Sequence, residues 1–226
     1  MHGFKTEGVI LKRRNFGEAD RILTVFTLHK GKISVIAKGV RRITSRRAGN
    51  VELLNRVSMY LYQGKGIPVL TEAEGLENFQ KLKEDLTLST YAYHIIELVD
   101  KLTAENQENR ILYEHLLEVL KRLENNPRQV LIRAFEAKIL SNLGFISFTS
   151  LGGNSKPPPR WDLLEKLELG QWDEIEKIKI DQKQALELER VLRYHLERVV
   201  EGQLKARKFL SAKPTLSAKP TFKNGR

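Results

Sequence analysis

Residues 29–47 read HKGKISVIAKGVRRITSRR and combine a short strand pattern with a dense group of cations. Gly31 stands in a Lys-Gly-Lys turn, and the apolar run that follows, with Ile33, Val35 and Ile36, favours a β-strand. Lys38-Gly39 ends the strand, and a loop follows that carries four arginines: Arg41, Arg42, Arg46 and Arg47. A buried strand that ends in such a loop can present cations to a polyanion.

Strand patterns surround this segment on both sides. They cover residues 4–14, 20–28, 33–38, 51–62 and 67–73, with Gly-containing turns at several of the joints. No helical pattern of any length interrupts them. Five strands in about 75 residues predict a small barrel. The basic residues at the strand exits favour the OB-fold, which binds single strands by backbone charge and base stacking.

Helical periodicity begins after Leu76. The expected helices cover residues 82–102, 111–123, 130–143, 161–169 and 182–200. Gly144 followed by Phe145 predicts a Schellman ending for the third of them. We therefore expect a multidomain α+β protein with an OB-fold domain at 1–78 and an all-α domain at 79–210. A linker at 146–160 and a disordered basic tail at 211–226, which contains the tandem repeat SAKPTL-SAKPTF, complete the prediction.

The charge is divided unevenly along the chain. Residues 1–66 hold 14 Lys/Arg against 4 Asp/Glu, a net +10, and residues 203–226 hold 7 against none. Residues 67–202 hold 18 against 24, a net −6. Polyanion binding is therefore expected at the two ends of the chain, and a different partner at the middle.

Several classes of function lack their residues. Cysteine is absent, which excludes disulfides, thiolate catalysis and cysteine-based metal sites. The Gly-Lys pairs lack a phosphate-binding loop, the histidines are scattered, and no apolar run is long enough to span a bilayer. We expect a cytoplasmic protein that is not an enzyme and has no cofactor.

The candidate nucleic-acid contacts are cations and two aromatic residues of the predicted barrel. Phosphate contacts need the cations, and bases stack on tyrosine rings. The candidates are Lys12, Arg13, Arg14, Arg21, Lys32, Lys38, Arg41, Arg42, Arg46, Arg47, Tyr60 and Tyr62.

Arg133 is a separate candidate in the acidic part of the chain. It lies in a predicted helix beside apolar Val130, Ile132 and Phe135. A cation next to apolar residues could bind an acidic peptide that ends in a hydrophobic residue. An ordinary surface arginine is the alternative.

The first 75 residues resemble the RecO family of bacterial recombination mediators. The matching segments are TEGVIL (6–11), GEADRIL (17–23), Gly31-Lys32 and AKGVRR (37–42). RAFE (133–136), LGF (143–145) and LKARKFL (204–210) extend the resemblance towards the end of the chain. It implies an OB-fold followed by a helical domain, as the strand and helix patterns also do.

The resemblance also implies an activity. Such a protein binds single- and double-stranded DNA, anneals complementary strands, and works with RecR in the RecFOR pathway. With RecR it loads RecA onto DNA coated by single-strand-binding protein (SSB), whose acidic tail it recognises. It implies association with the nucleoid and no covalent chemistry. Many members carry a four-cysteine zinc site after the segment that matches 143–145, but residues 146–160 here contain neither Cys nor His, so no zinc is expected.

Composition and strand pattern alone leave other functions open. An OB-fold that binds RNA in translation or RNA metabolism fits them equally well, and competition between DNA and RNA oligonucleotides would distinguish it. A protein–protein adaptor would show no salt-dependent binding to either.

Overall fold

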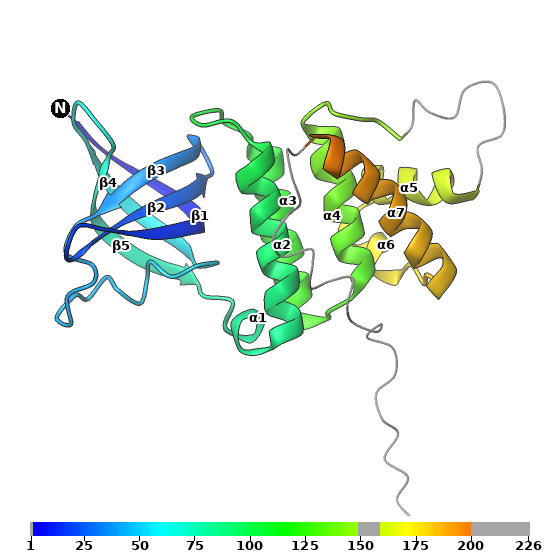
Figure 1. Ribbon diagram of the computed structural model, residues 1–226, viewed down its shortest axis with the longest axis horizontal. Helices are drawn as coiled ribbons and strands as arrows, with labels where there is room; N and C mark the ends of the chain where they lie inside the picture. The colour runs from blue at the N-terminus through cyan, green and yellow to red at the C-terminus, as the bar shows by residue number, and fades with distance from the viewer. Residues whose placement is uncertain (1, 149–158, 200–226) are drawn as a thin grey trace, which may run out of the picture.

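The computed structural model describes residues 2–148 and 159–199, and it places a β-barrel beside a bundle of helices (Figure 1). The strands are β1 (His2–Phe16), β2 (Asp20–Thr27), β3 (Gly31–Ala37), β4 (Arg56–Gln63) and β5 (Val69–Glu77). The helices are α1 (Gln80–Glu84), α2 (Leu86–Leu102), α3 (Arg110–Asn125), α4 (Gln129–Asn142), α5 (Pro159–Leu169), α6 (Trp172–Lys177) and α7 (Gln182–Val199). The predicted α+β organisation is confirmed.

The barrel is closed in the order β1-β2-β3-β5-β4, with β4 returning to pair with β1. All its pairs are antiparallel except β3 and β5, which meet in parallel at Ile36 and Val69. Five strands in a barrel that is nearly open at one seam are the arrangement expected of the OB-fold. The fold prediction made from the strand pattern is therefore confirmed.

The first strand belongs to two cores at once. An irregularity in its pairing between Ile10 and Lys12 lets β1 pair first with β4 and then with β2. Ile10 points into the barrel core, whereas Val9 and Leu11 belong to the core of the helical bundle. This strand therefore needs three consecutive apolar residues, because both of its faces are covered.

Two predicted boundaries differ from the structure. The strand predicted at 51–62 begins only at Arg56, because residues 51–54 form a turn whose Val51 and Leu54 are buried. The helix predicted at 82–102 is split at Asp85, whose carboxylate accepts hydrogen bonds of 2.8 Å from the backbone N–H groups of Thr87 and Leu88. An aspartate that caps the first turn in this way starts a new helix.

The predicted Schellman ending of α4 is confirmed. Gly144 has a positive φ of 74°, its N–H donates to the carbonyl of Ser141, and the N–H of Phe145 donates to the carbonyl of Leu140, both at 2.9 Å. The short helix α6 was not predicted.

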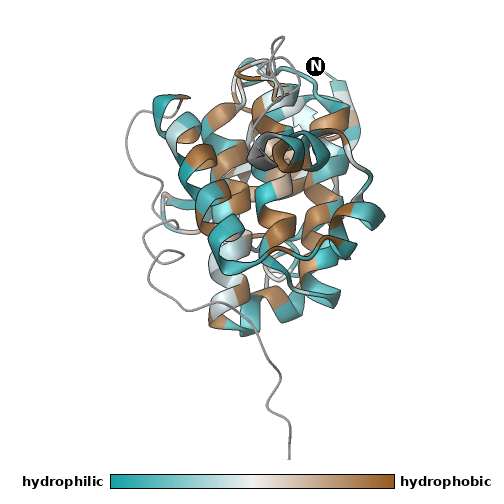
Figure 2. Ribbon diagram, turned by 90° about the vertical axis from the view of Figure 1, so that its right-hand side faces the viewer, coloured by the Kyte–Doolittle hydropathy of each residue, from teal (hydrophilic) through white to brown (hydrophobic). Residues whose placement is uncertain are grey.

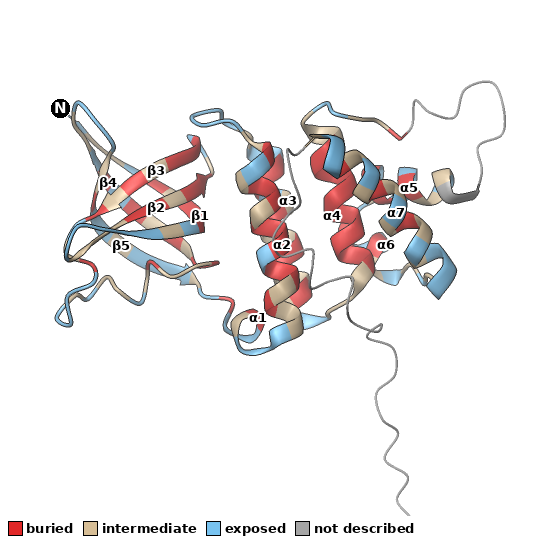
Figure 3. Ribbon diagram, in the orientation of Figure 1, coloured by how far each residue is buried: buried red, intermediate tan, exposed pale blue. Residues whose placement is uncertain are grey.

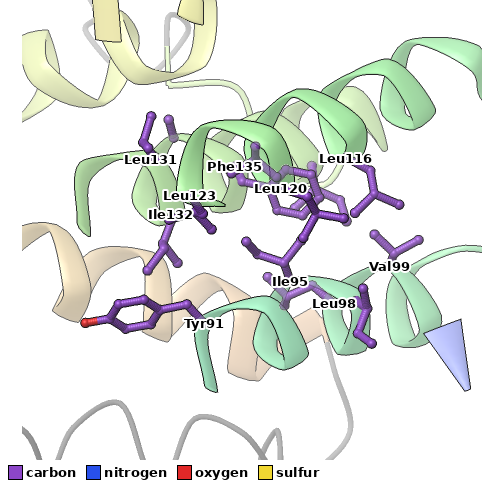
Figure 4. Packing of buried hydrophobic residues seen from close by; sticks show 14 of the residues in the cluster. Tyr91, Ile95, Leu98, Val99, Leu116, Leu120, Leu123, Leu131, Ile132 and Phe135 are labelled. Carbon is purple, nitrogen blue, oxygen red and sulfur yellow. The ribbon is translucent and has the colours of Figure 1, made fainter. Parts of the chain in front are cut away.

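The helical bundle is built around α4, in which every residue from 130 to 140 is buried (Figure 3). Figure 4 shows Ile95 of α2 and Leu116 and Leu120 of α3 in the same apolar cluster as Phe135 of α4. Seen from the helical side, the surrounding helices carry hydrophobic and hydrophilic residues on different faces (Figure 2). These helices bury their hydrophobic faces against α4.

Two predictions lie largely outside the described residues: the linker at 146–160, of which 149–158 are not described, and the tail at 211–226. Within the described ranges, no helix is both long and apolar enough to cross a membrane. The same ranges contain no group of three or more His, Cys, Asp or Glu residues suited to a metal ion.

Candidate nucleic-acid interface

The four arginines of the opening segment lie in a loop that we call the arginine loop, residues 38–50, between β3 and β4. The loop is a series of turns rather than an extended chain. Backbone hydrogen bonds close Gly39–Arg42 at 3.1 Å, Arg42–Ser45 at 2.9 Å and Ser45–Ala48 at 3.3 Å. It projects from the side of the barrel that faces away from the helices (Figure 1).

Arg47 ties this loop to the barrel. Its guanidinium donates to the carbonyl oxygens of Lys38 at 2.9 Å, Leu70 at 2.7 Å and Thr71 at 3.2 Å. Lys38 follows β3 and Leu70 belongs to β5, so Arg47 bridges the seam at which those two strands barely pair. These contacts give Arg47 a structural role.

A second tie joins the loop to the turn between β1 and β2. The N–H of Gly39 donates to the Asp20 carboxylate at 2.7 Å, and the N–H of Arg41 donates to the carbonyl of Ala19 at 2.9 Å. The Arg41 guanidinium reaches the carbonyl of Glu18 at 3.1 Å and remains exposed. The two loops therefore form one continuous edge of the barrel.

Arg13 and Arg21 share one acidic partner. Both form ion pairs with the carboxylate of Glu52, Arg21 at 3.0 Å, and all three side chains are partly buried. Two cations on one carboxylate leave a net positive charge, but their donors point to the turn that precedes β4.

Lys32 faces the helical bundle. It is 8% exposed, its ammonium donates to the Asp100 backbone carbonyl, and it lies 3.7 Å from the Asp100 carboxylate. A lysine enclosed by α2 in this way fastens β3 to the helices. A DNA contact by Arg13, Arg21, Lys32 or Arg47 stays a prediction, and their protein contacts do not favour it.

The remaining candidate cations are exposed and lie together. The strand pairing places Arg14, Ile22 and Ile36 in one row across β1, β2 and β3, and Lys12 two rows further along, opposite Thr24. Lys38 follows β3 directly and is the first residue of the arginine loop. We call this set the cationic edge; its members are Lys12, Arg14, Lys38, Arg41, Arg42 and Arg46.

The two tyrosines lie on a different part of the barrel. Tyr60 and Tyr62 are about two-fifths exposed on β4, and the strand order puts β5 between β4 and β3. The Tyr60 ring covers Gly3, where a Cβ atom would lie 2.4 Å from the tyrosine hydroxyl. Because the barrel is closed, a strand of nucleic acid would have to pass over β5, or over β1 and β2, to reach both the tyrosines and the arginine loop.

Arg133 lies within the helical bundle. Its guanidinium pairs with Glu136 at 2.8 Å and with Glu189 of α7 at 3.3 Å, and Glu136 in turn contacts His94 at 2.7 Å. Burial opposes ionisation here, but the two carboxylates outweigh it and raise the pKa of Arg133. Only 11% of its side chain is exposed, so a partner's carboxylate would compete with Glu189.

Sequence reasoning missed two features of this region. One is Glu52, whose position among arginines signals an ion pair, although sequence does not show which arginines reach it. The other is Ile43, a single apolar residue among polar ones at the tip of the arginine loop, and it is fully exposed. An isolated aliphatic residue in such a loop is the signal that could have identified it.

The fold defines a class: an OB-fold barrel joined to an all-α domain. Comparison with known families agrees with this class. Residues 1–79 match the family model described as recombination protein O N terminal, and residues 83–147 match recombination protein O C terminal. The chain belongs to the RecO family.

Curated relatives carry the name DNA repair protein RecO. The one from Acetivibrio thermocellus is 37% identical over 153 residues, which cover 66% of this chain and 61% of the relative. The one from Pelotomaculum thermopropionicum is 37% identical over 145 residues, or 64% and 57% of the two chains. The one from Roseiflexus is 35% identical over 143 residues, or 63% and 50%. The chain thus matches between half and three-fifths of the length of these relatives.

Proposed function

We propose that this chain binds DNA by its phosphates along the cationic edge and acts as a mediator of DNA repair and homologous recombination. The observation that carries the proposal is that six exposed cations lie on β1 and in one braced loop, two on the strand and four in the loop, and that the loop is hydrogen-bonded to the β1–β2 turn. Each phosphate that they neutralise releases counterions, which gives affinity without reading sequence.

Strand annealing follows from the same contacts. Two complementary strands repel each other, and a cationic surface that holds both lowers that repulsion and raises their local concentration. Annealing needs no covalent step, so the function that we propose is not enzymatic. The name of its relatives, DNA repair protein RecO, supports DNA as the polyanion rather than RNA.

The helical domain is proposed to serve partners. The acidic middle of the chain does not attract DNA, so the surface of the helical domain is left available to RecR and to the tail of SSB. Binding these partners would allow RecA to be loaded onto the DNA. Arg133 is the proposed anchor for an acidic tail, which would replace Glu189 at its guanidinium.

The test is a salt titration of oligonucleotide binding. We compare the unaltered chain with the double variant Arg42→Ala/Arg46→Ala, which keeps the Arg47 brace. Loss of two phosphate contacts should lower the slope of log K against log salt by about 1.4 on single strands. Arg110→Ala is the matched control, because Arg110 is an exposed arginine that pairs with Glu114 on α3.

An unchanged slope in the double variant would exclude the loop as the phosphate contact. The annealing activity is measured on SSB-coated complementary strands, with and without RecR. The same titration with matched RNA oligonucleotides distinguishes an RNA-binding protein, which would prefer them.

A further inference from the structure

The tip of the arginine loop presents an isoleucine. Ile43 and Thr44 are the central residues of the turn that the Ser45 N–H closes on the Arg42 carbonyl at 2.9 Å. The relative exposure of Ile43 is 105%, the highest of the large hydrophobic side chains in the described part of the chain. Its side chain therefore makes almost no contact with the protein itself.

The loop holds this side chain in place on both sides. Before the tip, the Arg42 N–H donates to the Gly39 carbonyl at 3.1 Å, and after it the Ala48 N–H donates to the Ser45 carbonyl at 3.3 Å. Arg47 fastens the base of the loop to three carbonyl oxygens of the barrel. The isoleucine is thus displayed on a chain of hydrogen-bonded turns.

The surroundings of Ile43 indicate what could cover it. A single exposed aliphatic residue is common on protein surfaces and by itself indicates nothing. Here Arg42 and Arg46 lie on either side of the tip, both exposed and without an ion pair among the described residues. Proteins that kink or open DNA use this combination: cations hold the phosphates, and an aliphatic side chain enters between neighbouring base steps.

We propose that Ile43 is a wedge that enters the base stack of duplex DNA while Arg42 and Arg46 hold the adjacent phosphates. This inference rests on the proposed DNA binding and adds a separate property, the unstacking of a base step. The step is non-covalent, and it costs least where stacking is weakest, at duplex ends, at junctions with single strands and at pyrimidine–purine steps. Ile43 would therefore direct the arginine loop to the places where strands separate or join.

The experiment uses the full chain and a duplex with a single-stranded tail, with 2-aminopurine in the base pair next to the junction. Unstacking raises the fluorescence of this base. We compare the unaltered chain with Ile43→Ala, Ile43→Leu and Ile67→Ala. Ile67 is an exposed isoleucine between β4 and β5, outside the arginine loop, and is the matched control.

The unaltered chain, Ile43→Leu and Ile67→Ala should raise the fluorescence, and the rise with Ile43→Ala should be at least about threefold smaller. The affinity of Ile43→Ala should stay within about fivefold, because the cations supply most of it. If Ile43→Ala unstacks the base as well as the unaltered chain, or if the unaltered chain binds without unstacking, the wedge is wrong while DNA binding stands. If the unaltered chain shows no salt-dependent binding, both proposals fail.

Discussion

Neighbouring arginines in one loop have different tasks. Arg47 gives its donors to backbone carbonyl oxygens, whereas Arg46 is exposed and its guanidinium makes no hydrogen bond or ion pair with the described part of the chain. A guanidinium whose donors are bound to carbonyl oxygens stabilises the fold, whereas an exposed guanidinium with unoccupied donors can bind phosphate. The two residues are therefore a matched pair for mutation.

Arg47→Ala should lower the free energy of unfolding by about 1–3 kcal/mol, because it removes three hydrogen bonds to carbonyl oxygens, of which the one to Leu70 is partly buried. Arg46→Ala should change stability by less than about 0.5 kcal/mol. It should lower the salt slope of single-strand binding by about 0.7. Urea unfolding and salt titration of both variants measure this. Equal stability of the two variants would contradict the bracing role of Arg47.

His115 makes stability depend on pH. Burial, and then the charge of Lys138, lower the pKa of this histidine to about 4, and its Nδ1 accepts a hydrogen bond of 3.2 Å from the Trp172 indole. The unfolded chain binds this proton near pH 6.5, and the folded chain only near pH 4. Stability from this group is therefore complete above pH 6.5 and is lost as the pH falls towards 4.

The expected loss is about 2 kcal/mol, which allows for the partial exposure of the ring. His115→Gln should remove this part of the dependence, since its amide oxygen can still accept from Trp172. Urea unfolding at a series of pH values between 4 and 7 tests it. Parallel curves for the variant and the unaltered chain would show that another group is responsible.

At the scale of elements, three helices meet at a buried polar network. His94 of α2 and Glu136 of α4 are fully buried, and Arg133 joins Glu136 to Glu189 of α7. Burying such charges is costly unless each has a partner, so the network fixes which faces of these helices meet.

Glu136→Ala should lower the free energy of unfolding by about 3–5 kcal/mol, because it leaves a buried guanidinium with only one carboxylate. The control is Glu114→Ala, which breaks an exposed pair with Arg110 on α3 and should cost less than about 0.5 kcal/mol. Thermal and urea unfolding measure both. A small effect of Glu136→Ala would mean that water reaches Arg133 and replaces the carboxylate.

The same network shows where sequence reasoning ends. Local signals predicted the five strands and the Schellman ending at Gly144, because those depend on residues close together in the chain. The role of Arg133 depends on Glu189, 56 positions away, and that of Arg13 on Glu52. The sequence does not show whether a given Lys or Arg side chain is exposed to solvent or paired with a carboxylate far away in the chain. The cationic edge could thus be predicted as a region, but its individual members could not.

At the scale of the whole molecule, the barrel and the helices share a core. Phe26 lies on the outer face of β2, is fully buried in the helical cluster, and its ring centre lies 6.2 Å from that of Tyr113. The Tyr113 hydroxyl donates to Glu7 of β1 at 3.1 Å, and Arg56 of β4 pairs with Glu7 at 2.9 Å. Burial, and then the charge of Glu7, raise the pKa of Tyr113, so this hydroxyl stays protonated. The joint therefore combines apolar contact with a polar cluster of Tyr113, Glu7 and Arg56.

Such a joint predicts cooperative unfolding. Both tryptophans, Trp161 and Trp172, lie in the helical part, so their fluorescence reports on the helices, while near-ultraviolet circular dichroism of the tyrosines includes Tyr60 and Tyr62 of the barrel. In the unaltered chain, the two signals should change together in urea. Phe26→Ala removes the ring that joins the cores and should cost about 3–5 kcal/mol. It should also separate the two transitions.

Leu61→Ala is the control, because Leu61 is fully buried in the barrel core alone. It should cost about 2–5 kcal/mol while the two signals still change together, since the joint is intact. Coincident transitions in Phe26→Ala would show that Val9, Leu11 and the Tyr113–Glu7 contact are enough to couple the domains. Separate transitions already in the unaltered chain would contradict the shared core. In that case the barrel with its arginine loop and the helical domain would unfold independently, and the joint would not couple DNA binding to a partner on the helices.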